Sequence, residues 1–272
     1  MKRTETKDRN GGGNSMADRV KTRVSLVVEL IDDFNNRIIT GNGIRVWIPG
    51  EKPPVRKPEG YYVFTNLSQA QAEVFIESGM YERQSVPVDL WETDAAYTAR
   101  KVRLVPGRAY VLPSGTTCVE GLAEPGSRIR IFSRESVKTL KLLYDYARGG
   151  EQEWKIGIYH PEDMDIEGKS LYIENRDKSN YEFFRISKGC KEGGRYVLSE
   201  PLKSDYKKIG TTIYPVHTAN ADENGRFFLP ISDIRENGCE FFCEAEGTGK
   251  TARNYTLVKG TVNKLDLLKK DE

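Results

Sequence analysis

Short apolar runs alternate with polar residues along most of the chain, and glycine, proline, asparagine and aspartate separate them. An alternation with a period of two residues predicts β-strands, and helical periodicity is scarce. The first unit of this pattern turns at residues 32–37, where aspartate and asparagine tolerate left-handed backbone geometry. Its expected strands lie at residues 25–31, 44–48, 61–64, 72–76 and 88–90. Its expected core residues are Val27, Leu30, Val46 and Phe64.

The order of segments in this first unit follows a known pattern. A strand leads to a D-x-x-N turn, a G-I-R-V-W-I strand at 43–48, an E-G-Y-Y-V-F hairpin at 59–64 and a final V-x-V strand. Residues 22–92 thereby resemble the carboxypeptidase regulatory-like, or transthyretin-like, β-sandwich. The resemblance implies a sandwich fold. It also implies an accessory module without chemistry of its own, as most members of that family are.

A weaker repeat of the pattern follows later in the chain. Residues 117–122 turn at 124–126 and return at 128–132, and residues 222–229 repeat the turn-glycine-aromatic hairpin. We therefore expect a mainly β protein with two tandem transthyretin-like or Ig-like sandwiches, the second of which contains a strand-rich insertion. The expected division is a disordered tail at 1–21, a first sandwich at 22–92, a linker at 93–114, a second sandwich at 115–264 with an insertion near 136–208, and a charged tail at 265–272.

The insertion holds one ambiguous segment, at residues 135–148. Its apolar residues alternate, as do those of 154–158, which predicts a hairpin across the glycines at 149 and 150. Val137, Leu140, Tyr144 and Ala147 also share a helical face, so a helix remains the alternative. Clearer strands are expected at 181–186, 195–198 and 209–214.

Charge and composition exclude several classes of protein. Lysine and arginine number 42 against 40 acidic residues, a net charge of +2 without a basic stripe, which argues against nucleic-acid binding. No apolar stretch approaches the roughly 20 residues of a membrane-spanning helix. The first twenty residues lack the apolar core of an export signal, so the four cysteines are expected to be reduced, buried thiols. These features predict a protein of the cytoplasm, or of a particle assembled there.

Residues with potential chemistry are few. The two histidines, His160 and His217, are too few for a triad or a multi-histidine metal site. Cys239 and Cys243 share one face of a predicted strand but lack a second pair of ligands, which favours buried thiols over zinc. Residues 246–251 end like a phosphate-binding loop, but Glu244 stands where that motif requires glycine.

An acidic segment at 163–174 approximates a calcium-binding loop. Asp163, Asp165, Glu167 and Glu174 occupy ligand positions of the pattern. Glu167 replaces the usual aspartate or asparagine, Ser170 replaces an apolar residue, and the flanks resemble strands instead of helices. These departures favour a solvated acidic turn, with calcium as the alternative.

The sequence assigns no catalytic, cofactor-binding or metal-binding residues. It therefore predicts a non-enzymatic structural or adaptor component of a larger assembly, whose partners are other protein subunits, copies of this chain among them, without nucleic acid or membrane insertion. Modules with the transthyretin-like pattern also occur in phage tails and in phage-tail-like contractile injection particles. The alternative is a carbohydrate- or surface-binding module that uses aromatics such as Tyr61, Trp91 or Trp154. An enzyme whose site forms only on folding is a third hypothesis.

Overall fold

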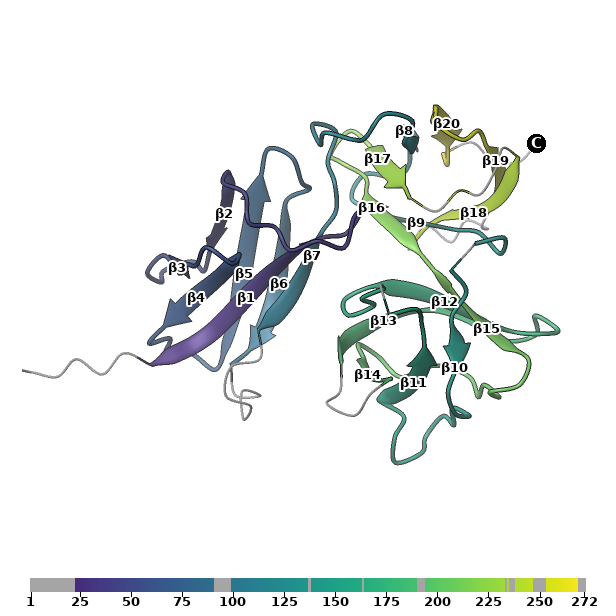
Figure 1. The fold of residues 1–272 in the computed structure, drawn as a ribbon, viewed down its shortest axis with the longest axis horizontal. Coiled ribbons are helices and arrows are strands. Elements are labelled where there is room, and N and C mark those ends of the chain that lie inside the picture. Colours follow the sequence, from purple (N-terminus) through teal and green to yellow (C-terminus); the bar gives the residue numbers. More distant parts are fainter. Residues whose placement is uncertain are drawn as a thin grey trace, which may run out of the picture.

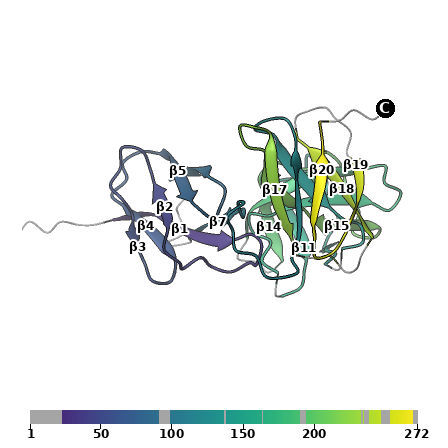
Figure 2. The ribbon, with the colours of Figure 1, turned by 90° about the horizontal axis from the view of Figure 1, so that it is seen from above.

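The computed structural model describes residues 23–90, 99–136, 138–162, 164–189, 194–232, 234, 238–246 and 253–268. These residues form twenty strands and no helix, which confirms the mainly β fold. The strands gather into three bodies (Figure 1). We call them the first unit (residues 24–104), the second unit (117–132 and 217–266) and the inserted unit (140–215). From above, the first unit lies to one side and the other two overlap (Figure 2).

The first unit contains two sheets with a shared core. One has the strand order β3-β4-β1-β7 and the other β2-β5-β6, and β7 runs parallel to β1. The buried residues of this unit form one cluster, and Val74, Leu30 and Phe64 are among them. The strands are β1 (Val24–Asp32), β2 (Ile44–Trp47), β3 (Val55–Arg56), β4 (Tyr61–Thr65), β5 (Gln71–Ser78), β6 (Gln84–Asp89) and β7 (Arg100–Leu104).

Three details of the first unit differ from the sequence-based expectation. Val27 is only half-buried because it alternates with the buried Leu26 and Val28, whereas Leu30, Val46 and Phe64 are buried as predicted. After the turn, the chain pairs with β1 only at an antiparallel bridge between Ile31 and Ile38, and the expected returning strand, β2, belongs to the other sheet. The segment expected to be a linker, 93–114, contributes β7 to the first sheet; residues 91–98 lie outside the described residues.

The turn after β1 lies at the predicted residues, and the Asp32 side chain stabilises it. Its Oδ1 accepts hydrogen bonds from the backbone N–H groups of Phe34 (2.9 Å) and Asn35 (3.2 Å). Asn36 adopts a left-handed backbone conformation with φ of 60°. The hydroxyl of Tyr81 donates to Asp32 Oδ2 at 2.9 Å, so a buried carboxylate fixes where the turn leaves the strand.

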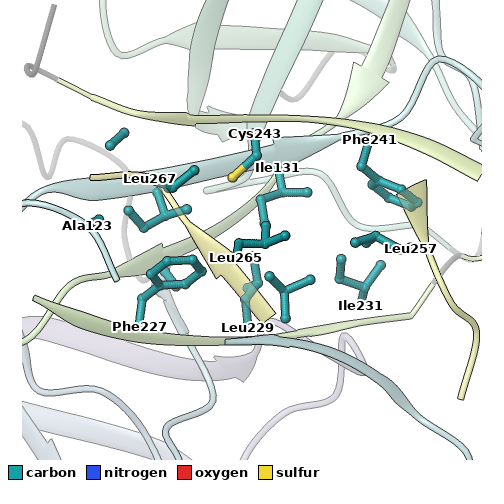
Figure 3. Packing of buried hydrophobic residues seen from close by; sticks show 14 of the residues in the cluster. Ala123, Ile131, Phe227, Leu229, Ile231, Phe241, Cys243, Leu257, Leu265 and Leu267 are labelled. Atoms are coloured by element: carbon teal, nitrogen blue, oxygen red, sulfur yellow. The ribbon is translucent and has the colours of Figure 1, made fainter. Parts of the chain in front are cut away.

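The second unit also has two sheets, with orders β17-β8-β20 and β16-β9-β18-β19. Its core lies between them, where Phe227, Leu265 and Cys243 meet (Figure 3). Its strand pairing repeats that of the first unit: β8 pairs antiparallel with β17 and parallel with β20, as β1 pairs with β4 and β7. The strands are β8 (Thr117–Leu122), β9 (Arg128–Phe132), β16 (His217–Asn220), β17 (Arg226–Ile231), β18 (Cys239–Ala245), β19 (Arg253–Leu257) and β20 (Val262–Asp266).

The repetition extends to the opposite sheets. β9 pairs antiparallel with β18, and β18 with β19, in the same way that β2 pairs with β5 and β5 with β6. The chain leaves the second unit after β9 and returns to it at β16, which pairs with the other edge of β9. The inserted unit therefore extends from β9 and β16.

The inserted unit is one six-stranded sheet whose ends meet. Its order is β10-β11-β14-β13-β12-β15, and an antiparallel bridge between Leu140 and Ile213 joins the chain beside β10 to β15. Side chains such as Ile158, Ile173 and Tyr206 fill its interior. The strands are β10 (Lys141–Leu142), β11 (Lys155–Tyr159), β12 (Ser170–Asn175), β13 (Tyr181–Gly189), β14 (Arg195–Leu198) and β15 (Thr211–Pro215).

The ambiguous segment at 135–148 contains a short strand instead of a helix in its described residues. β10 pairs antiparallel with β11, Leu142 opposite Ile158, which confirms the predicted hairpin. The predicted alternation ends early, since Tyr144 is exposed. Val137 lies outside the described residues.

Aromatic side chains join the inserted unit to the second unit. The ring of Phe132 at the end of β9 stacks on Tyr172 of β12 at 4.1 Å and on Phe242 of β18 at 5.1 Å. The Arg134 guanidinium lies 3.9 Å from the Phe242 ring centroid and donates three hydrogen bonds, at 2.9, 3.0 and 2.8 Å, to Glu174. This contact fixes the two units side by side.

Candidate functional site at the junction of the three units

Arg103 of β7 joins the first unit to the inserted unit. Its side chain is only 4% exposed, although arginine is usually a surface residue. Nη1 donates to Asn36 Oδ1 at 2.8 Å, and Nε and Nη2 donate to the backbone carbonyls of Glu167 and Asp165 at 2.5 and 2.6 Å. Because a buried guanidinium needs acceptors on several sides, these bonds tie the turn after β1 to the loop before β12.

Lys101, two residues earlier on the same strand, adds a second contact with this loop. Its Nζ lies 2.8 Å from Asp165 Oδ2 and 3.6 Å from Glu167 Oε2. Desolvation alone would raise the pKa of Asp165, but the hydrogen bonds from Lys101 and from the Glu167 N–H outweigh it and hold the pKa below its usual value. Asp165 therefore stays ionised at neutral pH.

Most of the acidic residues of the predicted calcium loop form ion pairs with lysine or arginine instead. Asp165 and Glu167, in the loop before β12, form ion pairs with Lys101, whereas Glu174 on β12 is buried and forms an ion pair with Arg134. Asp163 lies outside the described residues. In the part of the chain that is described, no three histidine, cysteine or acidic side chains gather as metal ligands would.

Glu82 connects the first unit to the second. Its carboxylate accepts hydrogen bonds from the Asn220 backbone N–H at 3.2 Å and from Asn220 Nδ2 at 2.7 Å. Burial raises the pKa of Glu82 to about 7, although the Asn220 bonds and the charge of Arg128 act in the opposite direction. This contact between the units is therefore expected to respond to pH near neutrality.

A polar cavity of about 200 Å³ lies where the three units meet. Arg128 of β9 and Arg185 of β13 line it from two different units. Arg128 Nη2 donates to Ser170 Oγ at 3.1 Å, and Arg185 Nε donates to the Gly168 carbonyl at 3.2 Å. Neither guanidinium forms an ion pair with a carboxylate of the described residues.

The electrostatics of the cavity are unusually positive. Burial is the largest cause that lowers the pKa of both Arg128 and Arg185. For Arg185, the charges of Arg128, Arg100 and Arg103 lower the pKa further, while Asp33 acts in the opposite direction. The Arg185 side chain as a whole is exposed, because the cavity continues into a groove of about 500 Å³ beside β13.

The other predicted residues lie away from this junction. Cys239 and Cys243 are buried in the core of the second unit, and Cys118 is buried on β8 of the same unit. Burial raises the pKa of the Cys243 thiol. The prediction of buried thiols is thereby confirmed for these three; Cys190 lies outside the described residues. The loop at 247–252 is likewise not described.

The two histidines occupy separate strand ends. His160 follows β11, and its ring nitrogens contact the Tyr196 hydroxyl and, at 2.8 Å, the Pro161 carbonyl. His217 begins β16 and is half-buried.

The aromatics considered for a binding face are distributed unevenly. Tyr61 is half-buried on β4 and Trp91 lies outside the described residues, whereas Trp154 is 51% exposed. Tyr144 is also exposed and lines a cavity of about 340 Å³ in the inserted unit. Its ring packs over Gly157, where an added Cβ would lie 2.7 Å from Tyr144 Cδ2.

Sequence reasoning did not find the junction residues. Arg103, Arg128 and Arg185 each stand in a strand next to apolar residues, and nothing local distinguishes them from solvent-facing arginines. Their shared cavity depends on the arrangement of three units.

No protein-family model matches the chain, and no curated protein matches it.

Proposed function

We propose that this chain is a non-enzymatic structural or adaptor component of a larger protein assembly. The observation that supports the proposal best is the junction itself, where Arg103, Glu82 and Arg134 each tie one unit to another through charged hydrogen bonds. An adaptor needs its binding faces in a fixed relative orientation. Directional, buried polar contacts provide such an orientation better than apolar contacts do, because they tolerate few alternative geometries.

We further propose that the first and second units are tandem sandwiches of the transthyretin-like type. Their matching strand pairings support this, since each sheet of one has its counterpart in the other. The resemblance of residues 22–92 to that family extends the proposal to assemblies such as phage-tail-like contractile particles. The buried thiols suit an assembly formed in the cytoplasm.

Purification of the chain from its native source at endogenous level tests the adaptor role. We expect it to elute well above its own mass of 30.9 kDa, together with defined protein partners or further copies of itself. Mass spectrometry of the co-eluting proteins identifies the assembly. Elution as a monomer without partners, at the concentration found in the cell, would contradict the proposal.

A carbohydrate- or surface-binding role is the second candidate. The exposed Trp154 and Tyr144 of the inserted unit support it, since sugars stack on exposed aromatic rings. Retention on polysaccharide columns that Trp154→Ala abolishes would favour this role. Retention on none of them, combined with co-eluting protein partners, would favour the adaptor.

A further inference from the structure

The charges around the junction cavity do not balance. Arg103 lies 3.5 Å from Asp33 Oδ1 and 3.7 Å from Asp165 Oδ1, and Lys169 lies 3.8 Å from Asp33. The carboxylates that border the cavity are thus engaged by Arg103 and Lys169. The guanidiniums of Arg128 and Arg185 remain without an ion-pair partner among the described residues, which leaves two positive charges lining one cavity, with the exposed Arg185 at its opening.

The donors of the cavity suit a tetrahedral oxyanion. A guanidinium presents several N–H groups in a fixed fork. The Arg128 and Arg185 side chains each donate to one acceptor among the described residues, so further N–H groups remain for a ligand. Ser170 Oγ accepts from Arg128, and its own proton is available to donate. A volume of about 200 Å³ exceeds the roughly 30 Å³ of one water, which leaves room for a group of several heavy atoms.

We propose that this cavity binds a phosphate group, held between Arg128 and Arg185. A dianion neutralises both guanidiniums, whereas a carboxylate would leave one of them uncompensated. The groove that opens at Arg185 leaves space for the rest of a phosphate ester, so the group is either the free ion or the end of a small phosphorylated molecule. Occupation would also strengthen the junction, because the ligand bonds to two units at once.

The repulsion between the two arginines supports this assignment. Burial and neighbouring positive charges lower the pKa of Arg185, and burial lowers that of Arg128. The shifts reflect the cost of desolvating both guanidiniums and the repulsion from the positive charges around them. Glu82 and Glu246 act on Arg128 as negative charges, but each also engages another residue: Glu82 accepts from Asn220, and Glu246 pairs with Arg130.

Isothermal titration calorimetry with inorganic phosphate at pH 7.5 and constant ionic strength tests the proposal. We expect saturable binding to the wild-type chain that weakens about tenfold or more in Arg185→Gln, since one charge-assisted bidentate contact is lost. Arg176→Gln is the matched control: it removes the same charge from an exposed position outside the cavity and should leave the affinity unchanged. Arg185→Lys, which keeps the charge but loses the fork, should bind with intermediate affinity.

Two further titrations identify the ligand class. Acetate should bind far more weakly than phosphate, and equal affinity would contradict the preference for a dianion. Glucose 6-phosphate distinguishes the sources: binding as tight as that of phosphate assigns the site to a phosphate ester, and binding of phosphate alone assigns it to the free ion. Absence of phosphate binding to the wild-type chain, or equal affinities of wild type and Arg185→Gln, would overturn the proposal. Melting curves in phosphate-free buffer confirm that each variant is folded.

Discussion

The interiors of the three units and the contacts of the first unit with the other two differ in chemistry. Inside the units the buried side chains are almost entirely apolar, with Phe64, Ile131 and Ile213 at 0 to 1% exposure. Between the first unit and the other two, the contacts are made by Arg103, Glu82 and their polar partners. Apolar burial folds each unit and, through the aromatic cluster around Phe132, also joins the second unit to the inserted unit, whereas charged hydrogen bonds place the first unit against both.

The two kinds of contact differ in energy as well as in chemistry. Each fully buried large apolar side chain contributes about 1.5–3 kcal/mol through removal of its surface from water. A buried ion pair gains Coulomb energy but loses much of it to desolvation, so its net contribution to stability is small. The junction is therefore expected to determine the orientation of the units more than their stability.

The largest expected effect is in the first unit's core. Phe64→Ala should lower the free energy of unfolding by about 3–5 kcal/mol, because the ring is 1% exposed and leaves a cavity. Chemical denaturation followed by tryptophan fluorescence measures it. Val27→Ala on β1, at a half-buried position, is the control and should cost less than half as much. Equal costs would show that the assigned face of β1 is incorrect.

Removal of the junction arginine should have an intermediate effect. Arg103→Met leaves the Asp165 and Glu167 carbonyls and Asn36 Oδ1 without their donor and is expected to cost about 2–4 kcal/mol. Calorimetry should then show the first unit melting separately from the others. Arg176→Met, at an exposed turn, is the control and should melt like the wild type. A single unchanged transition in Arg103→Met would show that the junction does not couple the units.

A smaller effect should depend on pH through Glu82. Its folded-state pKa near 7 lies above the usual 4.5, so the folded protein binds the proton more tightly than the unfolded chain does. This contribution to stability is present below pH 4.5 and is lost as the pH rises through 7. Relative to Glu82→Gln, the wild type should lose about 1–3 kcal/mol between pH 4.5 and pH 8. Denaturation at several pH values measures the difference.

The exposed Glu77 of β5 provides the control for that experiment. Glu77→Gln should follow the wild-type pH profile. If the stabilities of wild type and Glu82→Gln change with pH in parallel, the Glu82 carboxyl does not take up a proton in this pH range. The assignment of a pKa raised by burial would then be incorrect.

The smallest expected effect concerns calcium at the acidic loop. Asp165 and Glu174 already have different cationic partners, Lys101 and Arg134. Millimolar calcium should therefore leave the melting temperature unchanged. A rise in melting temperature that Glu174→Gln abolishes would show that the loop rearranges around a calcium ion and forms a metal site.

The same comparison explains what could be predicted from the sequence. Alternation locates β1, β4 and β18 closely, because period-2 burial is a local property of a strand. The parallel strand β7 was missed because its partner β1 lies some seventy residues earlier, and no local signal marks a parallel pairing. The junction was missed for the same reason, since Glu82 and Asn220 are 138 residues apart.

The arrangement of the units is the central claim, and a distance between spin labels tests it most directly. The labels belong on Val55 of β3, which is 53% exposed, and on Ile209 of the inserted unit, which is 91% exposed, in a Cys190→Ser background that leaves only buried native thiols. Double electron-electron resonance should give one narrow distance distribution for the wild type, and a broad one for Arg103→Met while each unit stays folded. A broad distribution in the wild type would contradict the fixed arrangement on which the adaptor proposal rests.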